Sequence, residues 1–257
     1  MGYVFDFKDA CEYDAGFESV LNRHRLDLEI RLMLDLLKPE TGQRILDIGC
    51  GTGISLEPLL DRGVSLTGLD PSPYMLDIAE ERLGSQVDLH RGSAEDLPFE
   101  DNAFDAAILF TSLEYTDRPA KAIEEACRVA KDTLVICVFN RYAPLNMVYR
   151  MKGLFVPNRL SHARFFSIWE LKELLTSMLG RVPVKWRTTL QLPFASGRML
   201  ARIENLALVQ KSLFGTIIGM RIKPVPKFRT RRLALKIRKR KIYKPATGLV
   251  SGLRIQK

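Results

Sequence analysis

The sequence lacks the features that would direct a protein into or across a membrane. No apolar run approaches the length of about eighteen residues that a spanning helix requires, and the longest candidate, residues 134–139, has the length of a strand. The amino terminus carries acidic and aromatic residues where a signal peptide would be basic and then apolar. The four cysteines, at positions 11, 50, 127 and 137, show no C-x-x-C spacing. We therefore expect free thiols, a cytoplasmic location and no metal site.

Acidic residues are missing from one end of the chain. Of the 39 Lys and Arg, 14 lie in residues 221–257, which hold no Asp or Glu, so residues 1–220 have 25 basic against 30 acidic residues. The net charge of +9 is therefore the average of a mildly acidic body and a basic tail, residues 224–257. This tail could contact nucleic-acid phosphates, attach to an anionic membrane surface, or neutralise the acidic body. Its low aromatic content argues against a surface for base stacking.

Strand-like apolar runs alternate with helical patterns along most of the chain. After a helical segment at 17–38, strands are expected at 44–49, 64–70, 87–92, 104–111 and 133–139, with helices at 54–63, 73–84 and 118–131. A further helix is expected after Ser167 and Glu170, which have capping-box spacing, and residues 183–192 and 214–224 could pair as the last strands. This order predicts an α/β fold: a doubly wound, Rossmann-like sheet, mostly parallel, with an antiparallel last strand.

The same pattern predicts one domain over residues 1–223, with a helical cover over residues 1–40 and the basic tail as an extension. Residues 141–166 and 195–212 interrupt the alternation and are predicted to be lid-like inserts. The first insert is aromatic, basic and contains methionine. It is either a lid over an acceptor pocket or an ordinary packed connection.

Three glycines alternate at the end of the first predicted strand. Gly49, Gly51 and Gly53 would let the backbone turn tightly and let a ligand approach closely at the carboxyl end of the sheet. Position 54 is Ile, so the third glycine of the nicotinamide-binding pattern G-x-G-x-x-G is absent. A nicotinamide-dependent reductase is therefore disfavoured.

Two aspartates accompany this loop. Asp47 lies just before it, where a pyrophosphate would gain nothing from a negative charge but an ammonium group would gain a charge-assisted hydrogen bond. Asp70 ends the second predicted strand, 21 residues after Gly49. An acid at that spacing is suited to binding both hydroxyls of a ribose. The pair predicts a ligand that carries an ammonium group and a ribose.

Three ordered segments carry a family resemblance: LDIGCGTG at 46–53, GLDPSPYML at 68–76 and GSAEDLPFEDNAFDAAI at 92–108. They resemble the class I S-adenosylmethionine-dependent methyltransferases, in the methyltransferase type 11 branch of the ubiquinone and menaquinone biosynthesis enzymes. The resemblance covers about residues 40–140 and implies S-adenosylmethionine as the cofactor. It implies that the glycine loop receives the methionine part, that Asp47 helps to hold its amino group directly or through water, and that Asp70 holds the ribose. The full set of cofactor-binding residues that it implies is Tyr13, Asp47, Gly49, Cys50, Gly51, Gly53, Asp70, Pro71, Met75, Ser93, Ala94, Glu95, Thr111, Ser112 and Leu113.

The resemblance implies methyl transfer to a small molecule. Alternatives are an RNA or protein methyltransferase, or a cofactor-binding scaffold that no longer catalyses. Because transfer from a sulfonium depends mainly on alignment, the sequence does not identify a catalytic residue. Glu114, Tyr115, His24 and Tyr142 are weak candidates by position, and the oligomeric state stays open.

Overall fold

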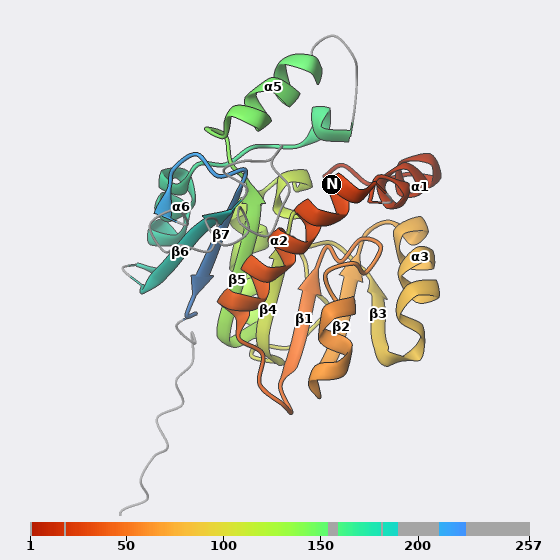
Figure 1. Cartoon of the computed structure of the whole chain (residues 1–257). Helices are drawn as coiled ribbons and strands as arrows, with labels where there is room; N and C mark the ends of the chain where they lie inside the picture. The colour runs from red at the N-terminus through yellow and green to blue at the C-terminus, as the bar shows by residue number, and fades with distance from the viewer. Residues whose placement is uncertain (1, 18, 154–158, 181, 190–210, 225–257) are drawn as a thin grey trace, which may run out of the picture. The chain divides into compact units, whose positions relative to one another are not determined.

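The strands form one mixed sheet, whose parallel part is the one that the sequence predicts. The computed structural model describes residues 2–17, 19–153, 159–180, 182–189 and 211–224. The strand order is β3-β2-β1-β4-β5-β7-β6 (Figure 1). Strands β1 to β5 pair in parallel, whereas β7 runs antiparallel between β5 and β6. Their bounds are β1 Arg44–Ile48, β2 Ser65–Asp70, β3 Val87–Arg91, β4 Phe104–Phe110, β5 Ala130–Phe139, β6 Val184–Thr189 and β7 Ile217–Ile222.

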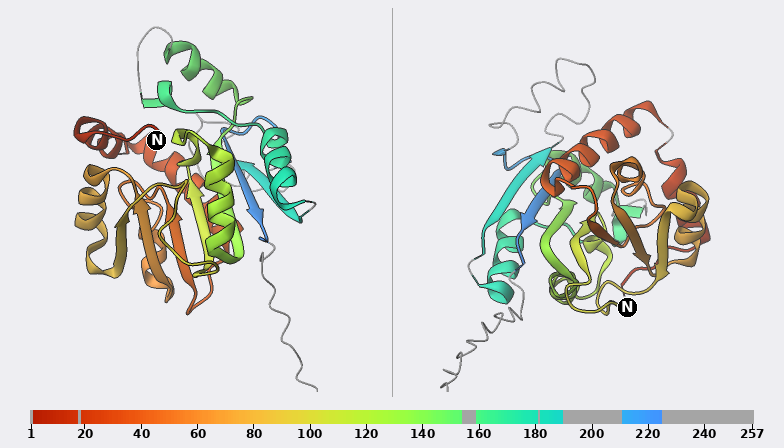
Figure 2. Two further views of the ribbon diagram at one scale, coloured as in Figure 1. Left: turned by 180° about the vertical axis from the view of Figure 1, so that it is seen from behind. Right: turned by 90° about the horizontal axis from the view of Figure 1, so that it is seen from below.

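Helices cover both faces of this sheet, which gives the chain two apolar cores (Figures 1 and 2). Helices α2 and α3 pack on one face, and α4 and α6 pack on the other. The helices are α1 Phe7–Ala15, α2 Val20–Leu37, α3 Pro73–Leu83, α4 Pro119–Val129, α5 Pro144–Gly153 and α6 Ile168–Leu179. Short 3-10 turns are η1 Glu57–Arg62, η2 Gly84–Gln86, η3 Leu113–Tyr115 and η4 Arg159–His162. Strands covered on both faces explain their near-continuous apolar sequences.

Several local features differ from the prediction. Residues 54–63 contain the 3-10 turn η1 and no α-helix. Helix α1 lies within the predicted helical cover of residues 1–40, but the sequence pattern predicts a separate helix only over 17–38. The capping box of α1, formed by Asp6 and Asp9, is visible in the sequence as an acid pair three residues apart. Ser167 accepts the Glu170 N–H at 3.1 Å as expected, but the Glu170 carboxylate binds arginines elsewhere, so the box is only half formed.

The structure describes most of the first predicted insert but little of the second. Residues 141–166 contain α5 and η4, separated by residues outside the described ranges. Most of the insert 195–212, and the tail beyond Pro224, lie outside the described residues. The domain boundaries therefore stay predictions. Within the described ranges, no helix combines the length and the apolar character needed to cross a bilayer.

Candidate functional site

A pocket opens at the carboxyl ends of β1, β2 and β4. It encloses about 840 Å³, counting the open space at its mouth, which is within the usual size of a small-molecule site. One part of its wall is the glycine loop after β1, and another is Asp70 at the end of β2. The remaining parts come from the turn after β3, the end of β4 and the amino-terminal residues 2–5.

The glycines of the loop serve different purposes, although all three have a left-handed backbone. At Gly51 (φ +52°) an added Cβ would meet only the Met75 sulfur, at 3.9 Å, so this position faces the open pocket. At Gly49 (φ +75°) a Cβ would lie 2.4 Å from the Ser112 Cβ. At Gly53 (φ +76°) it would lie 2.5 Å from a Leu83 methyl group. The missing Cβ at Gly51 therefore leaves room for a ligand, whereas at Gly49 and Gly53 it leaves room for the neighbouring side chains of Ser112 and Leu83.

Asp70 ties the loop to the second strand. Its Oδ2 accepts the Gly51 N–H and its Oδ1 accepts the Ser72 N–H, both at 2.9 Å. The side chain is buried, and this burial raises its pKa to about 6 against the lowering effect of the two N–H donors. Each carboxylate oxygen keeps a second acceptor site. At neutral pH, Asp70 is an anion that can still accept hydrogen bonds from two hydroxyl groups of a ligand.

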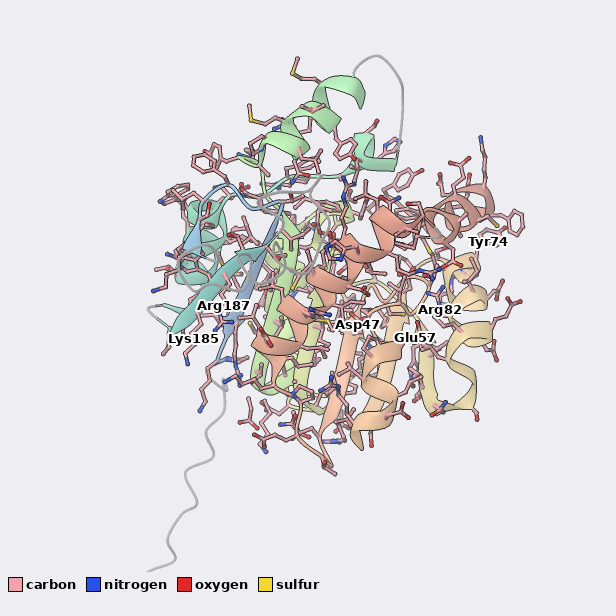
Figure 3. The ribbon with its side chains drawn as sticks, in the orientation of Figure 1. Asp47, Glu57, Tyr74, Arg82, Lys185 and Arg187 are labelled. Atoms are coloured by element: carbon pink, nitrogen blue, oxygen red, sulfur yellow. The ribbon has the colours of Figure 1, made fainter. Side chains whose placement is uncertain are left out.

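Asp47 lies behind the pocket wall. It is fully buried at the penultimate position of β1 (Figure 3), and its Oδ2 accepts a hydrogen bond from the Ser55 hydroxyl. Ser55 itself lines the pocket, whereas Asp47 does not. The other oxygen, Oδ1, is buried without a hydrogen-bond partner among the described residues. Burial raises the pKa of Asp47 to about 7. Asp47 therefore acts on the pocket through Ser55.

Arg82 of α3 fixes the far side of the loop (Figure 3). Its Nη1 donates to the carbonyl oxygen of Thr52 at 2.9 Å and to the Thr52 hydroxyl at 3.0 Å. Its Nη2 donates to Asp14 of α1 at 2.6 Å. One guanidinium thus holds the glycine loop and the first helix together.

Thr111, at the end of β4, is a further unusual feature of the wall. It is β-branched and yet has a φ of +48°, a conformation that such residues rarely adopt. Its N–H donates to the Cys137 carbonyl oxygen at 2.8 Å, which fixes the turn. Backbone strain of this kind is commonly found at ligand sites.

Comparison with known proteins agrees with this geometry. A family model described as a methyltransferase domain matches residues 46–137. An uncharacterized protein of Methanocaldococcus jannaschii is 34% identical over 180 residues, which are 68% of this chain and 80% of that protein. A solved structure from Thermotoga maritima, titled as a SAM-dependent methyltransferase and possible histamine N-methyltransferase, has a TM-score of 0.67 and 27% identity, covering 85% of this chain and 97% of its own. The chain belongs to the class I S-adenosylmethionine-dependent methyltransferases.

Several of the similar curated proteins are demethylmenaquinone methyltransferases. A demethylmenaquinone methyltransferase of Renibacterium salmoninarum is 38% identical over 123 residues, which are 46% of this chain and 52% of that enzyme. The chain spans about half the length of the curated relatives of this kind that it matches. S-adenosylmethionine is the cofactor of the family and of this chain.

The residues present fit that cofactor. Gly51 leaves the space that a Cβ would fill, as a close approach by a ligand requires. The Asp70 carboxylate suits two ribose hydroxyls, and the Ser55 hydroxyl, backed by the buried carboxylate of Asp47, suits an amino-acid end. Met75 offers a buried, apolar surface for a base. These donors, acceptors and apolar surfaces match the three parts of S-adenosylmethionine.

The structure brings most of the predicted cofactor-binding residues together. Those that line the pocket are Tyr13, Gly49, Cys50, Gly51, Asp70, Pro71, Met75, Ser93, Ala94, Glu95, Thr111 and Ser112. Gly53 and Leu113 do not line it: Gly53 packs against α3, and Leu113 is fully buried in a core. Glu95 lines the pocket while its carboxylate accepts the Arg118 N–H at 2.8 Å and pairs with the Arg118 guanidinium at 3.3 Å. Burial raises the pKa of the Cys50 thiol, so it stays protonated.

The weak catalytic candidates are spread apart. Of the four, Tyr115 alone lines the pocket. Glu114 is buried beside it in η3, where its Oε1 accepts the Phe139 N–H at 2.6 Å and burial raises its pKa to about 8. His24 is half-buried on α2. Tyr142 is exposed and meets Trp169 edge-on.

The sequence analysis missed the amino-terminal part of the wall. Gly2, Tyr3, Val4 and Phe5 line the pocket, with Ile54, Ser55, Phe110 and Thr116 as further missed residues. Tyr3 N–H donates to the Tyr115 carbonyl oxygen at 2.9 Å, and the Ser72 hydroxyl donates to the Phe5 carbonyl oxygen at 2.6 Å. Gly2 is tightly placed as well, because a Cβ there would lie 2.0 Å from the Tyr115 oxygen. The aromatic residues at positions 3 and 5 are the one signal that the sequence offered.

Proposed function

We propose that the chain transfers the methyl group of S-adenosylmethionine to a small, apolar, ring-containing acceptor of the quinone kind in its reduced, quinol form, which supplies the electron pair of the new bond and releases one proton. The observation that carries this proposal is that the cofactor half of the pocket continues into an aromatic wall. Tyr3, Phe5, Tyr13 and Tyr115 form this wall and line the same pocket as Gly51 and Asp70. The name of the Renibacterium relative supports the acceptor class.

The aromatic wall is a packed unit. Phe5 lies edge-on to Tyr115 at 5.0 Å and to Tyr13 at 6.0 Å between ring centroids, and Tyr3 lies edge-on to Phe5 at 5.3 Å. Rings held in this way offer a flat or edge-on partner to another ring, at about 0.5–1.5 kcal/mol for each good contact. A planar apolar acceptor gains most from such a wall.

The charge of the lining also supports a small apolar acceptor. Among the described residues that line the pocket there is no Lys, Arg or His, and the charged ones are Asp70 and Glu95. A nucleic-acid acceptor brings phosphates that basic side chains would have to neutralise. The lining thus favours a neutral acceptor over RNA.

The chain's own residues would act mainly by alignment. S-adenosylmethionine, when bound, supplies a methyl group on a sulfonium that needs no further activation. The loop at Gly51 and the Asp70 carboxylate would fix the donor side, while the aromatic wall would orient the acceptor and exclude water. Holding two reactants in line can supply about 7–11 kcal/mol in the best intramolecular cases. Tyr3 is a poor general base, because its hydrogen bond to Asp9 and its burial raise its pKa to about 12.

The test measures release of S-adenosylhomocysteine from the full chain with three acceptor classes: a demethylated naphthoquinol kept reduced, total RNA and a mixture of proteins. Release with the naphthoquinol alone is expected. Release only with RNA or protein would overturn the acceptor class. Cofactor binding by calorimetry with no release from any class would identify a scaffold.

A further inference from the structure

The large apolar side chains that stand exposed gather at one edge of the molecule. Within the described residues, those outside helix α5 lie where elements start or end at the carboxyl edge of the parallel strands. Phe7 and Trp169 are in the first turns of α1 and α6, Tyr142 follows β5, and Phe214 precedes the antiparallel β7. The pocket opens at the same edge. This edge therefore exposes large apolar side chains, and the opposite edge does not within the described residues.

Helix α5 carries the densest part of this apolar surface and stands beyond the sheet edge (Figure 1). Met147 is 52% exposed and Met151 is 64% exposed, and Val148 is exposed beside them. Positions three and four apart share a helix face, so these three side chains form one apolar strip.

The opposite side of α5 explains why this strip stays outside. Leu145 and Asn146 are buried. The Asn146 amide donates to the carbonyl oxygens of Asn140 and Thr216, at 2.9 Å each, which anchors the helix to the ends of β5 and β7. The methionine strip faces outward because this anchored side faces the protein.

The charge around α5 has one sign. Residues 141–166 contain five Lys and Arg and no Asp or Glu, although the body of the chain as a whole is mildly acidic. Arg141 and Arg164 pair with Glu170, at 2.9 and 2.7 Å. Arg150 follows Met147 by three positions, stands over the Phe165 ring at 5.5 Å and makes no ion pair within the described residues. An apolar strip with a cation at its border has the pattern of an interfacial helix.

Residues that follow α5 in the chain lie beside the pocket wall. Tyr3, which lines the pocket, stacks on His162 of η4 with 4.2 Å between ring centroids. The Arg164 N–H donates to the carbonyl oxygen of Glu114, at 2.9 Å. Tyr142 meets the exposed Trp169 edge-on near the start of α5, and such amphipathic rings are common at the boundary between lipid and water.

We propose that the exposed face of α5, formed by Met147, Val148 and Met151, docks on the surface of an anionic lipid bilayer, with Arg150 at the headgroups. The basic residues of this segment complement an anionic headgroup layer, and the outward methionine strip suits the apolar layer beneath it. Docking would place the aromatic side of the pocket next to the phase in which an apolar acceptor dissolves. This last consequence rests on the proposed function, whereas the docking itself does not.

The experiment measures binding of the full chain to sedimented vesicles of equal parts phosphatidylcholine and phosphatidylglycerol, and to phosphatidylcholine vesicles alone. One variant, Met147→Asp/Met151→Asp, removes the apolar strip. A second, Arg150→Glu/Lys152→Glu, reverses the charge of α5. Its matched control, Lys185→Glu/Arg187→Glu, makes the same change of net charge on β6, away from α5 (Figure 3).

Wild type is expected to bind the anionic vesicles and to bind phosphatidylcholine more weakly. The apolar variant should lose about tenfold or more in affinity, since each buried methylene contributes. The α5 charge variant should lose about 30-fold in affinity for the anionic vesicles, because each basic residue near an anionic surface contributes about a factor of five and the variant removes two. The β6 control should lose no more than about threefold at physiological salt, because distant charges are screened.

All four proteins carry residues 225–257, so the contribution of the basic tail is common to them. Equal calorimetric affinity for S-adenosylhomocysteine in all four shows that the variants are folded. Failure of wild type to bind either vesicle would overturn the proposal, as would α5 variants that bind like wild type or a β6 control that loses as much as the α5 charge variant. Methyl transfer to a soluble naphthoquinol is assayed without vesicles, so failure of docking and failure of the proposed function are distinguishable.

Discussion

Adding one methyl group at Gly51 separates the role of the glycine loop in folding from its role in binding. In Gly51→Ala the new Cβ has no protein atom nearer than the Met75 sulfur, at 3.9 Å, and projects into the pocket. The cost to folding is therefore only that of a left-handed alanine, about 1–2 kcal/mol. For a domain of this size, Tm should fall by about 2–8 °C.

The cost to binding comes on top of this. A methyl group in a filled site behaves like overpacking, which typically costs about 1–3 kcal/mol, so affinity for S-adenosylhomocysteine should fall about 5-fold to 150-fold. Isothermal titration calorimetry measures the affinity, and thermal unfolding without ligand measures the Tm.

Gly42→Ala is the matched control. Gly42 also has a left-handed backbone (φ +85°), and a Cβ there would meet nothing within 4 Å. It precedes β1, at the edge of the sheet opposite the pocket. This variant should lose a similar amount of stability and keep the wild-type affinity. Wild-type affinity in Gly51→Ala, or an equal loss of affinity in Gly42→Ala, would refute the assignment of Gly51 to the cofactor.

Three further predictions concern groups around the pocket. Asp70 is an anion only above its raised pKa of about 6, so affinity for S-adenosylhomocysteine should fall about tenfold when the pH is lowered from about 7 to 5. An affinity that calorimetry finds unchanged over this range would contradict the role of Asp70. Arg82→Met removes the bonds to Thr52 and Asp14, which should lower the free energy of unfolding by about 1.5–3 kcal/mol in urea titrations; no change would mean that these bonds contribute nothing net. Glu114 has a folded pKa of about 8 against 4.5 when unfolded, so the folded state holds more protons between these values and wild-type stability falls as pH rises through them. Urea titrations across this range should show a flatter profile for Glu114→Gln, and parallel profiles would argue against a buried, protonated Glu114.

The parts of the site that the sequence predicted are those set by local spacing. Gly49 and Gly51 lie directly after a strand and Asp70 closes the next one, and neighbouring parallel strands end at one edge. The alternation of apolar runs likewise predicts the order and direction of most strands. The 3-10 turn η1 was read as an α-helix because a short apolar pattern does not distinguish the two.

The parts that the sequence did not predict depend on contacts between distant residues. Tyr3 reaches the pocket by pairing with Tyr115, more than a hundred positions away, and no periodicity records such a contact. Ser55 stands between Asp47 and the pocket because of the path of the loop. The sequence predicts that Asp47 acts on the ligand directly or through water, and it does not indicate the hydroxyl that lies in front of Asp47.

The position of β7 has a consequence for synthesis of the chain. Within the part of the chain that the structure describes, strand β6 pairs with β7 alone, and β7 fills the place beside β5 although it is the last of the seven described strands to leave the ribosome. Until Ile222 has emerged, one side of β5 has no neighbour among the described strands, and β6 has none among them. A nascent chain halted before Ile217 would therefore present two unprotected β-edges at once, the kind of surface that chaperones cover and aggregates recruit.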